Sequence, residues 1–330
     1  MLQTKDLAVV ILNWNGKALL EQFLPSVLKH SNDAVIYVAD NASTDNSIAY
    51  VSEAFPMVKI IKNADNGGYA KGYNTALQEV NEPLLCLLNS DIEVTENWLR
   101  PIVLEFNTHK DTAIVQPKIL DYKAKSHFEY AGAAGGFIDK FGYPFCRGRI
   151  FDSIEEDTGQ YNDNVDIFWA SGACFFIRNS VFKALEGFDE TYFAHMEEID
   201  LCWRAFNSNY ITKYIGTSVV YHVGGATLSN TNPQKTYLNF RNSLFTLFKN
   251  TDSQVFFRIV TRMLLDGVAA LRFLLQLKPA FLFAILKAHF SFYYNLPQLL
   301  KQRKQGTQRA KYYQCKSIVW LYFVKKRTVF

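Results

Sequence analysis

The first ninety residues alternate between short apolar runs and segments typical of helices. The apolar runs cover residues 7–12, 34–39, 58–61 and 84–88, and the helix-like segments cover residues 17–29, 44–55 and 72–80. Strands and helices that alternate in this way form βαβ units with parallel strands. The sequence therefore predicts an α/β fold, with a mixed, mostly parallel sheet flanked by helices.

Polar side chains follow three of these apolar runs. They are Asn13 and Asn15 after the first, Asp40 and Asn41 after the second, and Asn89, Ser90 and Asp91 after the fourth. Ligands of open α/β sheets bind just beyond the carboxyl ends of the strands. Asp40 could therefore accept a hydrogen bond from a nucleobase or a ribose, or the polar run after it could only cap a helix. Asp91 is placed where a ligand would lie, although a lone Asp after a strand more often caps a turn.

Two later clusters carry metal-ligand or acid-base side chains. Glu197, Glu198 and Asp200 stand in HMEEIDLCWR, and His222 follows an apolar run. Together with Asp91 these residues could hold one Mg²⁺ or Mn²⁺ ion with positions left open for substrate phosphates. Each has an ordinary alternative, because acids often form an exposed first helical turn and a lone His is more often a core residue.

Both clusters belong to a series of sequence blocks whose order along the chain is informative. The blocks are VVILNWNG, VADNASTDNS, NADNGGYAKGYN, LLNSDIEV, WASGACFFIR, GFDETYFAHMEEIDLCWRA, YHVGG and YLNFRNSL. Together they resemble the inverting, metal-dependent glycosyltransferases of family 2, which have the GT-A fold, and are most similar to their rhamnosyltransferase-like branch. The resemblance covers roughly the first three quarters of the chain. It implies transfer of one sugar from a nucleotide-diphosphate sugar to an acceptor hydroxyl.

The resemblance also implies roles for individual residues. Asn89-Ser90-Asp91 stands where the family has its metal-binding D-x-D motif, with Asn89 in place of the first Asp, and Asp91 and His222 would be the metal ligands. The residues expected at the donor are Asn13, Asn15, Asp40, Asn41, Asn66, Gly67, Asn74, Asn89, Ser90 and Arg241. Arg241 could bind the diphosphate or the acceptor, or pair with a surface acid.

The catalytic base of the family aligns with Glu198, with Glu197 as its rival and Asp200 in the same cluster. Three carboxylates so close should raise one another's pKa, while the helix N-terminus opposes this. Asp200 and Arg204 can pair along one helix face and leave the preceding acids freer.

The acceptor side is expected at three residues of WASGACFFIR. Trp169, Ser171 and Gly172 would line it, although Ser-Gly-Ala is also ordinary close packing. The Gly-rich and aromatic segment 122–149 is expected to be a flexible acceptor loop.

The C-terminal region has a different composition, which divides the chain into a catalytic domain, 1–250, and a basic, aromatic helical extension, 251–330. Residues 267–330 hold 12 Lys and Arg and no acid, a net charge of +12. Because the whole chain has a net charge of +4, the preceding residues have a net charge of −8. Residues 255–277 predict an amphipathic helix with Arg258, Arg262, Asp266 and Arg272 on one arc. Such a region favours an anionic membrane surface, with packing on the core or a homodimer interface as alternatives. No nucleic-acid-binding motif accompanies it.

The remaining features concern location and competing functions. Five scattered Cys without C-x-x-C spacing, and no signal peptide, predict a cytoplasmic protein, peripheral at the inner face of the plasma membrane. A lipid-linked or growing cell-surface polysaccharide would then be the acceptor. Two alternatives are a sugar nucleotidyltransferase, which would need a basic Gly-rich loop where this chain has LNWNGKAL, and a noncatalytic carbohydrate-binding module, which would not need the acids.

Overall fold

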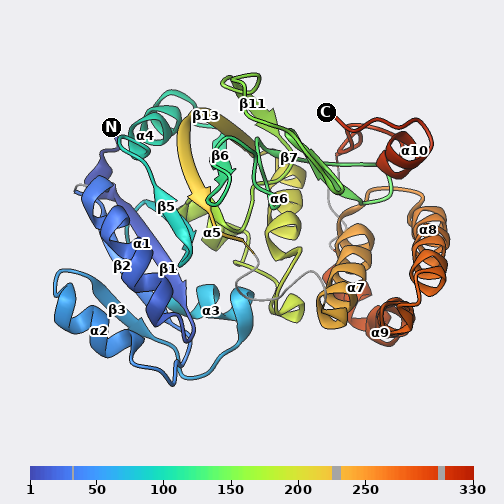
Figure 1. Cartoon of the computed structure of the whole chain (residues 1–330), viewed down its shortest axis with the longest axis horizontal. Helices are drawn as coiled ribbons and strands as arrows, with labels where there is room; N and C mark the ends of the chain where they lie inside the picture. The colour runs from blue at the N-terminus through green and yellow to red at the C-terminus, as the bar shows by residue number, and fades with distance from the viewer. Residues whose placement is uncertain (32, 225–231, 304–308) are drawn as a thin grey trace.

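The computed structural model describes residues 1–31, 33–224, 232–303 and 309–330 (Figure 1). Its main sheet has, within these ranges, nine strands in the order β11-β13-β6-β12-β4-β1-β2-β3, with β5 paired to β13. The parallel half contains the four strands predicted from the apolar runs: β1 (Leu7–Asn13), β2 (Val35–Asp40), β3 (Lys59–Lys62) and β4 (Leu84–Asn89). The predicted α/β fold with a mixed sheet is confirmed.

The other strands of this sheet bring the ends of β4 and β13 together. They are β5 (Ile92–Val94), β6 (Thr112–Asp121), β11 (Asn164–Ile167), β12 (Cys174–Arg178) and β13 (Ile211–His222). Strand β12 is antiparallel to both β4 and β6, whereas β13 runs parallel to β6. Because β5 directly follows β4 and pairs with β13, Ile92 lies opposite His222.

Helices cover both faces of the main sheet. The predicted helices are α1 (Lys17–His30), α2 (Ser47–Ala54) and α3 (Gly68–Ala76), and α4 (Leu99–Thr108), α5 (Asn179–Ala184) and α6 (Glu197–Asn207) follow, with 3-10 turns at Thr4–Asp6 and Glu190–Tyr192. Helices α1, α2 and α4 cover the face of the sheet to which Val9 of β1 contributes. Helices α3, α5 and α6 cover the opposite face, to which Val10 contributes. Burial on both faces explains why these strands are continuously apolar.

The segment 122–149 is not a flexible loop, so that prediction is wrong. It forms much of a small antiparallel sheet of β7 (Gly136–Ile138), β8 (Pro144–Cys146), β9 (Arg149–Ile150) and β10 (Ser153–Ile154). Gly142 and Gly148 lie between successive strands with φ of 80° and 86°, which only glycine adopts without strain. The glycines thus make tight turns, and the aromatic residues Phe128 and Phe145 are buried.

The C-terminal helices form a separate layer beside the sheet (Figure 1, right). They are α7 (Pro233–Asn250), α8 (Val255–Leu275), α9 (Pro279–Gln302) and the short α10 (Ile318–Phe323). The predicted helix at 255–277 is therefore present as α8. One buried cluster continues from Leu201 of α6 to Phe292 of α9, so this region packs on the catalytic part of the chain.

Within the four described ranges, no helix is both long enough and apolar enough to cross a bilayer.

Candidate active site

The carboxyl ends of β1 and β2 carry a network centred on the Asn13 amide. In the parallel register Asn13 lies opposite Asp40. The Asn13 Nδ2 donates to Asp40 Oδ1 (3.3 Å), Ser43 Oγ (3.1 Å) and Ser47 Oγ (3.0 Å), while its Oδ1 is buried without a partner. Asn13 and Asp40, both predicted at the donor, are therefore adjacent at the expected edge of the sheet.

The predicted donor residues on the neighbouring loops are engaged in hydrogen bonds within and between those loops. Asn41 Nδ2 donates to Asn66 Oδ1 (3.0 Å) and Gly68 O (2.9 Å), and Asn41 Oδ1 accepts from Asn63 Nδ2 (3.0 Å). Asn15 Oδ1 accepts from the backbone N–H groups of residues 44 and 45. These amides hold the loops after β1, β2 and β3 in place, and Gly67, which precedes α3, lies among them.

Asn74 is engaged in a different way from the one predicted. Its side chain exchanges two 2.9 Å hydrogen bonds with the backbone of Phe188 and donates to Glu190 Oε1 (3.0 Å). Its amide groups are used in joining α3 to the segment before α6. A direct contact with the donor is therefore not supported by its position.

Asp91 and His222 meet where β4 and β13 end. The His222 Nε2 lies 3.1 Å from Asp91 Oδ1, and His222 Nδ1 lies 3.3 Å from Glu129 Oε1. All three side chains are buried. Burial lowers the pKa of His222, but the two carboxylates outweigh this and raise it to about 10, so without another cation the imidazole is protonated.

The pair of Asp91 and His222 fits a divalent cation that takes its other ligands from a substrate. A carboxylate and a neutral imidazole are ligands that such an ion accepts, and the 3.1 Å between Asp91 Oδ1 and His222 Nε2 would let both bind one ion if the imidazole lost its proton. Glu129 would orient the imidazole through its other nitrogen, as carboxylates commonly do for metal-bound His. In the described part of the chain, no group of three or more His, Cys, Asp and Glu side chains is arranged to hold a metal by itself.

The start of α6 places two acids on a strained backbone. Phe193, His195 and Met196 have φ of 59°, 70° and 73°, in the left-handed region that non-glycine residues avoid. Glu197 and Glu198 begin the helix, and the Oε2 atom of each is buried without a hydrogen-bond partner.

The two glutamates differ in exposure and in pKa. Burial and the charge of Glu198 hold the pKa of Glu197 well above its usual range, and the Glu197 side chain is buried. Glu198 is half-buried, and desolvation raises its pKa to about 7 although backbone N–H groups of the first turn oppose the shift. A carboxyl group that titrates near neutrality and can reach a ligand is suited to accept a proton.

Asp200 has a structural environment rather than a reactive one. Its carboxylate accepts hydrogen bonds from Arg204 Nε (2.8 Å) and Asn250 Nδ2 (2.8 Å), and Lys249 Nζ lies 3.1 Å away. Burial raises the pKa of Asp200, but Lys249 and Arg204 outweigh it and hold it at about 2. The predicted pairing with Arg204 is confirmed, and the position of Asp200 does not support its inclusion among the catalytic acids.

Arg241 and Asn242 of α7 bind the backbone just before α6. Asn242 Nδ2 lies within hydrogen-bonding distance of the carbonyl oxygens of Tyr192 (3.2 Å), Ala194 (2.9 Å) and His195 (2.7 Å). Arg241 donates to the carbonyl oxygens of Thr191 (3.0 Å) and Tyr192 (3.2 Å). Arg241 therefore supports this segment, and the predicted diphosphate or acceptor contact is not supported by its hydrogen bonds.

Of the three residues predicted on the acceptor side, only Gly172 lies beside the acids. Trp169 is buried and donates to Phe137 O (2.8 Å), and Ser171 is buried and donates to Ala131 O. A side chain at Gly172 would instead meet Tyr69 Oη at 3.3 Å and Glu198 Cδ at 3.8 Å. Trp169 and Ser171 are thus part of the interior, in keeping with the ordinary close packing expected of Ser-Gly-Ala.

Short contacts link the Asp91–His222 pair to residues 171–173, and Gly172 lies beside Glu198 of the acidic helix. The backbone N–H of Asn89 donates to Ala173 O (2.9 Å), next to Gly172, and Ser90 and Asp91 follow. On the other side Glu129 accepts from Ala131 N (2.6 Å), and Ala131 O accepts from Ser171. The structure therefore gathers residues 91, 172, 198 and 222 in one region.

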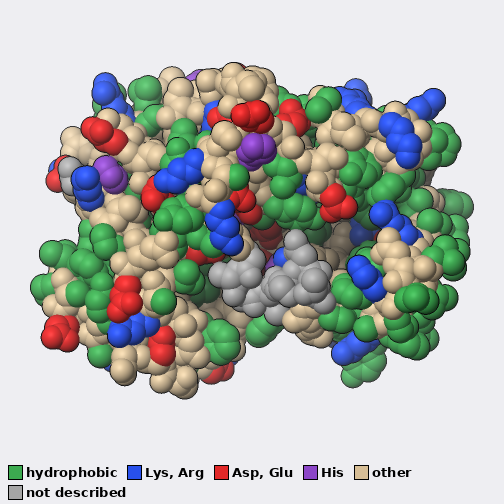
Figure 2. Space-filling view, viewed as in Figure 1, with side chains coloured by type: hydrophobic (Ala, Val, Ile, Leu, Met, Phe, Trp, Pro, Cys, Tyr) green, Lys and Arg blue, Asp and Glu red, His purple; other side chains and the backbone are tan. Residues whose placement is uncertain are grey.

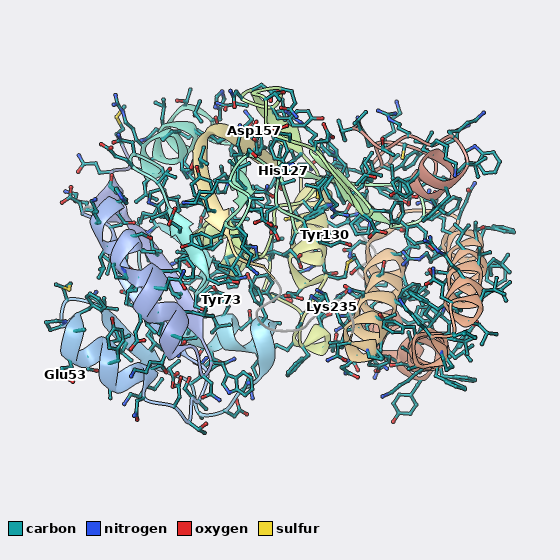
Figure 3. All side chains as sticks on the ribbon, viewed as in Figure 1. Glu53, Tyr73, His127, Tyr130, Asp157 and Lys235 are labelled. Atoms are coloured by element: carbon teal, nitrogen blue, oxygen red, sulfur yellow. The ribbon has the colours of Figure 1, made fainter. Side chains whose placement is uncertain are left out.

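Lys235 adds a positive charge to this region. It lies in the first turn of α7, near the centre of the molecule with Tyr130 (Figure 3). Burial and, to a smaller extent, the charge of Lys235 lower the pKa of His195 to about 4. Burial lowers the pKa of Lys235 itself, and the charge of Glu129 partly opposes this shift.

Sequence reasoning missed Glu129 and Tyr69, and it noted Asn242 beside Arg241 without giving it a role of its own. Glu129 fell in the segment expected to be a loop, and no spacing linked it to His222. Tyr69 donates from α3 to Gly172 O (2.7 Å), but in the sequence it is only one residue of a Gly-rich block. Asn242 follows Arg241 in YLNFRNSL, where the charged residue is the more conspicuous candidate.

The parallel half-sheet with polar residues at its carboxyl edge, and the acids at the start of α6, are compatible with the class of nucleotide-sugar glycosyltransferases. The sequence of residues 8–186 matches the family model described as "Glycosyl transferase family 2". The chain belongs to this family and is an inverting glycosyltransferase with a nucleotide-sugar donor.

Curated relatives have compatible activities. The chain is 26% identical over 244 residues to the N-acetylglucosaminyl-diphospho-decaprenol L-rhamnosyltransferase of Mycobacterium tuberculosis, covering 66% of this chain and 76% of the relative. It is 25% identical over 213 residues to the low-salt glycan biosynthesis hexosyltransferase Agl10 of Haloferax volcanii, covering 62% of each. Neither the nucleotidyltransferase nor the noncatalytic alternative is supported.

Solved structures with low sequence identity share the GT-A fold. The mannosyltransferase PcManGT from Pyrobaculum calidifontis, in complex with GDP-Man and Mn²⁺, has a TM-score of 0.56 at 10% identity and covers 88% of this chain and 87% of that one. GalNAc-T7, with UDP, GalNAc and Mn²⁺, has a TM-score of 0.57 at 17% identity and covers 73% and 48%. The predicted GT-A fold is confirmed.

Proposed function

We propose that the protein transfers one sugar to a hydroxyl group of a lipid-linked saccharide, with Glu198 as the general base and a Mg²⁺ or Mn²⁺ ion held by Asp91 and His222. The observation that carries the proposal is the Glu198 carboxyl group, which is half-buried, has an unpartnered oxygen and lies beside Gly172. The proposal includes the predicted location at the inner face of the plasma membrane, where a lipid-linked acceptor is within reach.

Glu198 is favoured over Glu197 for two physical reasons. A base must touch the acceptor hydroxyl, and Glu198 is the less buried of the two. A base must also be ionised near neutral pH, and the pKa of Glu198 is about 7, whereas that of Glu197 is well above its usual range because of burial and the neighbouring charge.

The reaction is a single displacement. The oxygen of the acceptor hydroxyl bonds to the anomeric carbon while Glu198 accepts the proton of that hydroxyl. The bond between the anomeric carbon and the diphosphate oxygen breaks on the opposite face. The nucleoside diphosphate leaves with the bonding electrons, and the configuration inverts. A divalent cation at Asp91 and His222 would offset the negative charge of the leaving diphosphate. The partly buried His195, whose pKa is lowered to about 4 by desolvation and by the charge of Lys235, remains neutral beside these acids.

The donor sugar and the acceptor are proposed by similarity. The relative from Mycobacterium tuberculosis is named as a rhamnosyltransferase that acts on a diphospho-decaprenol-linked sugar. We therefore propose a nucleotide-activated deoxyhexose as the donor and a polyprenyl-diphosphate-linked saccharide as the acceptor.

Incubation of the purified protein with nucleotide sugars and Mn²⁺ tests the activity. Release of a nucleoside diphosphate, and a product linkage inverted relative to the donor in an NMR spectrum, are expected with a polyprenyl-linked acceptor. Absence of release with every nucleotide-activated hexose and deoxyhexose would overturn the proposal.

Calorimetric titration with Mn²⁺ and a nucleoside diphosphate tests the cation site without turnover. Asp91→Asn should weaken Mn²⁺ binding by about tenfold or more, because one of two protein ligands loses its charge. Asp111→Asn, at an exposed acid, serves as the matched control and should bind like the wild type. Equal Mn²⁺ affinity of both variants would overturn the cation site at Asp91 and His222. It would not bear on the proposed role of Glu198 as the general base.

A further inference from the structure

Helix α8 turns its charged side inward and its apolar side outward, the reverse of a helix on a water-exposed surface. Its charged residues Arg258, Arg262 and Asp266 face the interior, with exposed fractions of 8%, 3% and 0%. Large apolar residues at the usual helical spacing face outward instead: Phe257, Val260, Leu264, Val268, Leu271 and Leu275. A helix next to water normally buries its apolar face, because that removes apolar surface from water.

The buried charges of α8 are fixed by partners from other parts of the chain. Arg262 donates to Asp266 Oδ1 (2.8 Å) and to Ser243 Oγ of α7 (2.7 Å), and its guanidinium lies 3.8 Å from the ring centre of Tyr143. Asp266 also accepts from Tyr143 Oη (2.7 Å) and lies 3.5 Å from His289 Nε2 of α9.

Arg258 is held in the same way, by Asp252 (3.1 Å) and by Tyr312 Oη (3.0 Å). Buried charges are tolerated only when partnered, and these contacts set the rotation of α8 about its axis. The apolar face is therefore held outward by specific contacts.

Helix α9 extends this apolar face. Phe283, Leu286, Phe290, Tyr293 and Tyr294 are exposed, and they recur at intervals that place them along one side of the helix. Helices α8 and α9 pack against each other, and Tyr293 Oη of the exposed row of α9 lies 3.3 Å from Met263 Sδ of α8. The two rows together are hereafter called the α8–α9 face. Figure 2 shows hydrophobic side chains over this part of the molecule, with Lys and Arg among them.

The charge around the α8–α9 face identifies its partner. Lys278, Lys287 and Lys301 lie on α9 or directly before it and are exposed, and no acid follows Asp266 in the sequence. A second copy of the chain would bring the same positive charges together, which is unfavourable, whereas an anionic surface complements them. Phe and Tyr beside Lys and Arg are also the residues that enter the membrane interface.

We infer that the α8–α9 face inserts its apolar side chains into an anionic lipid membrane, with the surrounding Lys and Arg at the lipid headgroups. The inference deepens the proposed function, because a polyprenyl-linked acceptor lies in such a membrane. The buried ion pairs of α8 then have a clear purpose, since they leave the apolar face free for lipid.

Flotation with lipid vesicles tests this surface. The wild type should bind vesicles that contain phosphatidylglycerol, bind pure phosphatidylcholine vesicles more weakly, and lose binding as salt rises. The double variant Leu264→Ser/Phe290→Ser, at side chains with exposed fractions of 68% and 74%, should bind at least about tenfold more weakly because it lacks two inserting groups. The matched control Met57→Ser/Leu104→Ser, at 69% and 64%, should bind like the wild type.

Three outcomes would overturn the inference: no binding of the wild type to anionic vesicles, equal binding of both double variants, or conversion of a wild-type dimer to a monomer by the α8–α9 variant with vesicle binding unchanged. Hydrolysis of the nucleotide sugar, measured without vesicles, separates this test from the proposed function. Vesicle binding without hydrolysis would support the α8–α9 face and count against the enzyme, and hydrolysis without vesicle binding would do the reverse.

Discussion

Glu197 and Glu198 are identical side chains at neighbouring positions, yet their surroundings assign them different chemistry. Desolvation raises the pKa of both, because a charge is costly away from water. Only Glu198 remains accessible and titrates near neutrality. The pKa of Asp200, in the same helical turn, is lowered instead, because Lys249 and Arg204 stabilise its charged form.

Replacement of the proposed base should remove turnover without harming the fold. Glu198→Gln is expected to lower kcat for transfer by roughly 10²- to 10⁴-fold, the usual contribution of general base catalysis, with little change in donor affinity. Glu53→Gln, at an exposed acid at the edge of the molecule (Figure 3), is the control and should keep wild-type kinetics. Loss of activity in Glu197→Gln with full activity in Glu198→Gln would reverse the assignment.

The pH dependence of rate and stability should differ in sign. Because the base must be ionised, kcat/KM should rise with pH and level off above about pH 7. The folded-state pKa of Glu198 is raised, so its contribution to stability is present below its unfolded pKa and is lost as pH rises through about 7. Glu198→Gln should therefore have a higher Tm than the wild type at pH 8 and a similar Tm near pH 4. Equal Tm values at pH 8 would show that Glu198 is not desolvated.

At the scale of elements, the start of α6 depends on a helix that is distant in sequence. Left-handed φ values at Phe193, His195 and Met196 cost about 1–3 kcal/mol each and persist only when other contacts fix them. Asn242 of α7 contacts three carbonyl groups of this segment, and Phe193 O accepts from Tyr69 N (2.8 Å). The position of Glu198 is thus set jointly by α3 and α7.

Removal of the Asn242 amide should affect catalysis more than its stability cost explains. Asn242→Ala is expected to destabilise the fold by about 1–3 kcal/mol, because buried carbonyls lose their donor, and to lower kcat with little change in KM. Asn179→Ala is the matched control, since Asn179 is also buried and donates to the carbonyls of Val80 (3.1 Å) and Glu82 (3.0 Å). It should cost similar stability and keep kcat. Equal kcat values in the two variants would limit Asn242 to a structural role.

At the scale of the whole molecule, the C-terminal region completes the core of the catalytic part. The rings of Trp203 and Tyr312 lie 4.5 Å apart, and those of Phe137 and Phe330 lie 5.0 Å apart. The side of this region that faces the rest of the chain is buried and holds both apolar residues such as Phe292 and the ion pair of Arg262 and Asp266, while α8 and α9 present an apolar face outward. Packing on the core and membrane contact are therefore compatible uses of the same region.

Truncation after Asn250 should destabilise the catalytic part. It would expose residues such as Trp203 and Phe137, which now pack against the rings of Tyr312 and Phe330. The full chain should unfold in a single calorimetric transition, and the truncated chain should have a lower Tm or aggregate. Two separate transitions in the full chain, one of them kept after truncation, would show instead that 1–250 and 251–330 are independent domains.

The sequence by itself determined the parallel half of the sheet and the chemical types at the site. Apolar runs fix strands that are covered on both faces, and the residues that follow them must lie at one edge of a parallel sheet. Asn13, Asp40 and Asp91 could therefore be assigned to that edge from the pattern of residues alone. The block that contains Glu198 was informative because it resembles the catalytic block of the family, and its flanking aromatic residues indicated burial.

Tertiary structure alone decided which of these side chains remain available for chemistry. Glu129 reaches His222 from an irregular stretch held against β6, in a segment whose glycines are typical of a loop. Arg241, Asn74, Trp169 and Ser171 are occupied by partners far away in sequence. The rotation of α8, which buries its charges and exposes its apolar face, also depends on contacts with α7, α9 and Tyr143. The physical reason is common to all: local periodicity sets what an element can bury, but only long-range packing sets which face it buries and which polar groups it leaves unpaired.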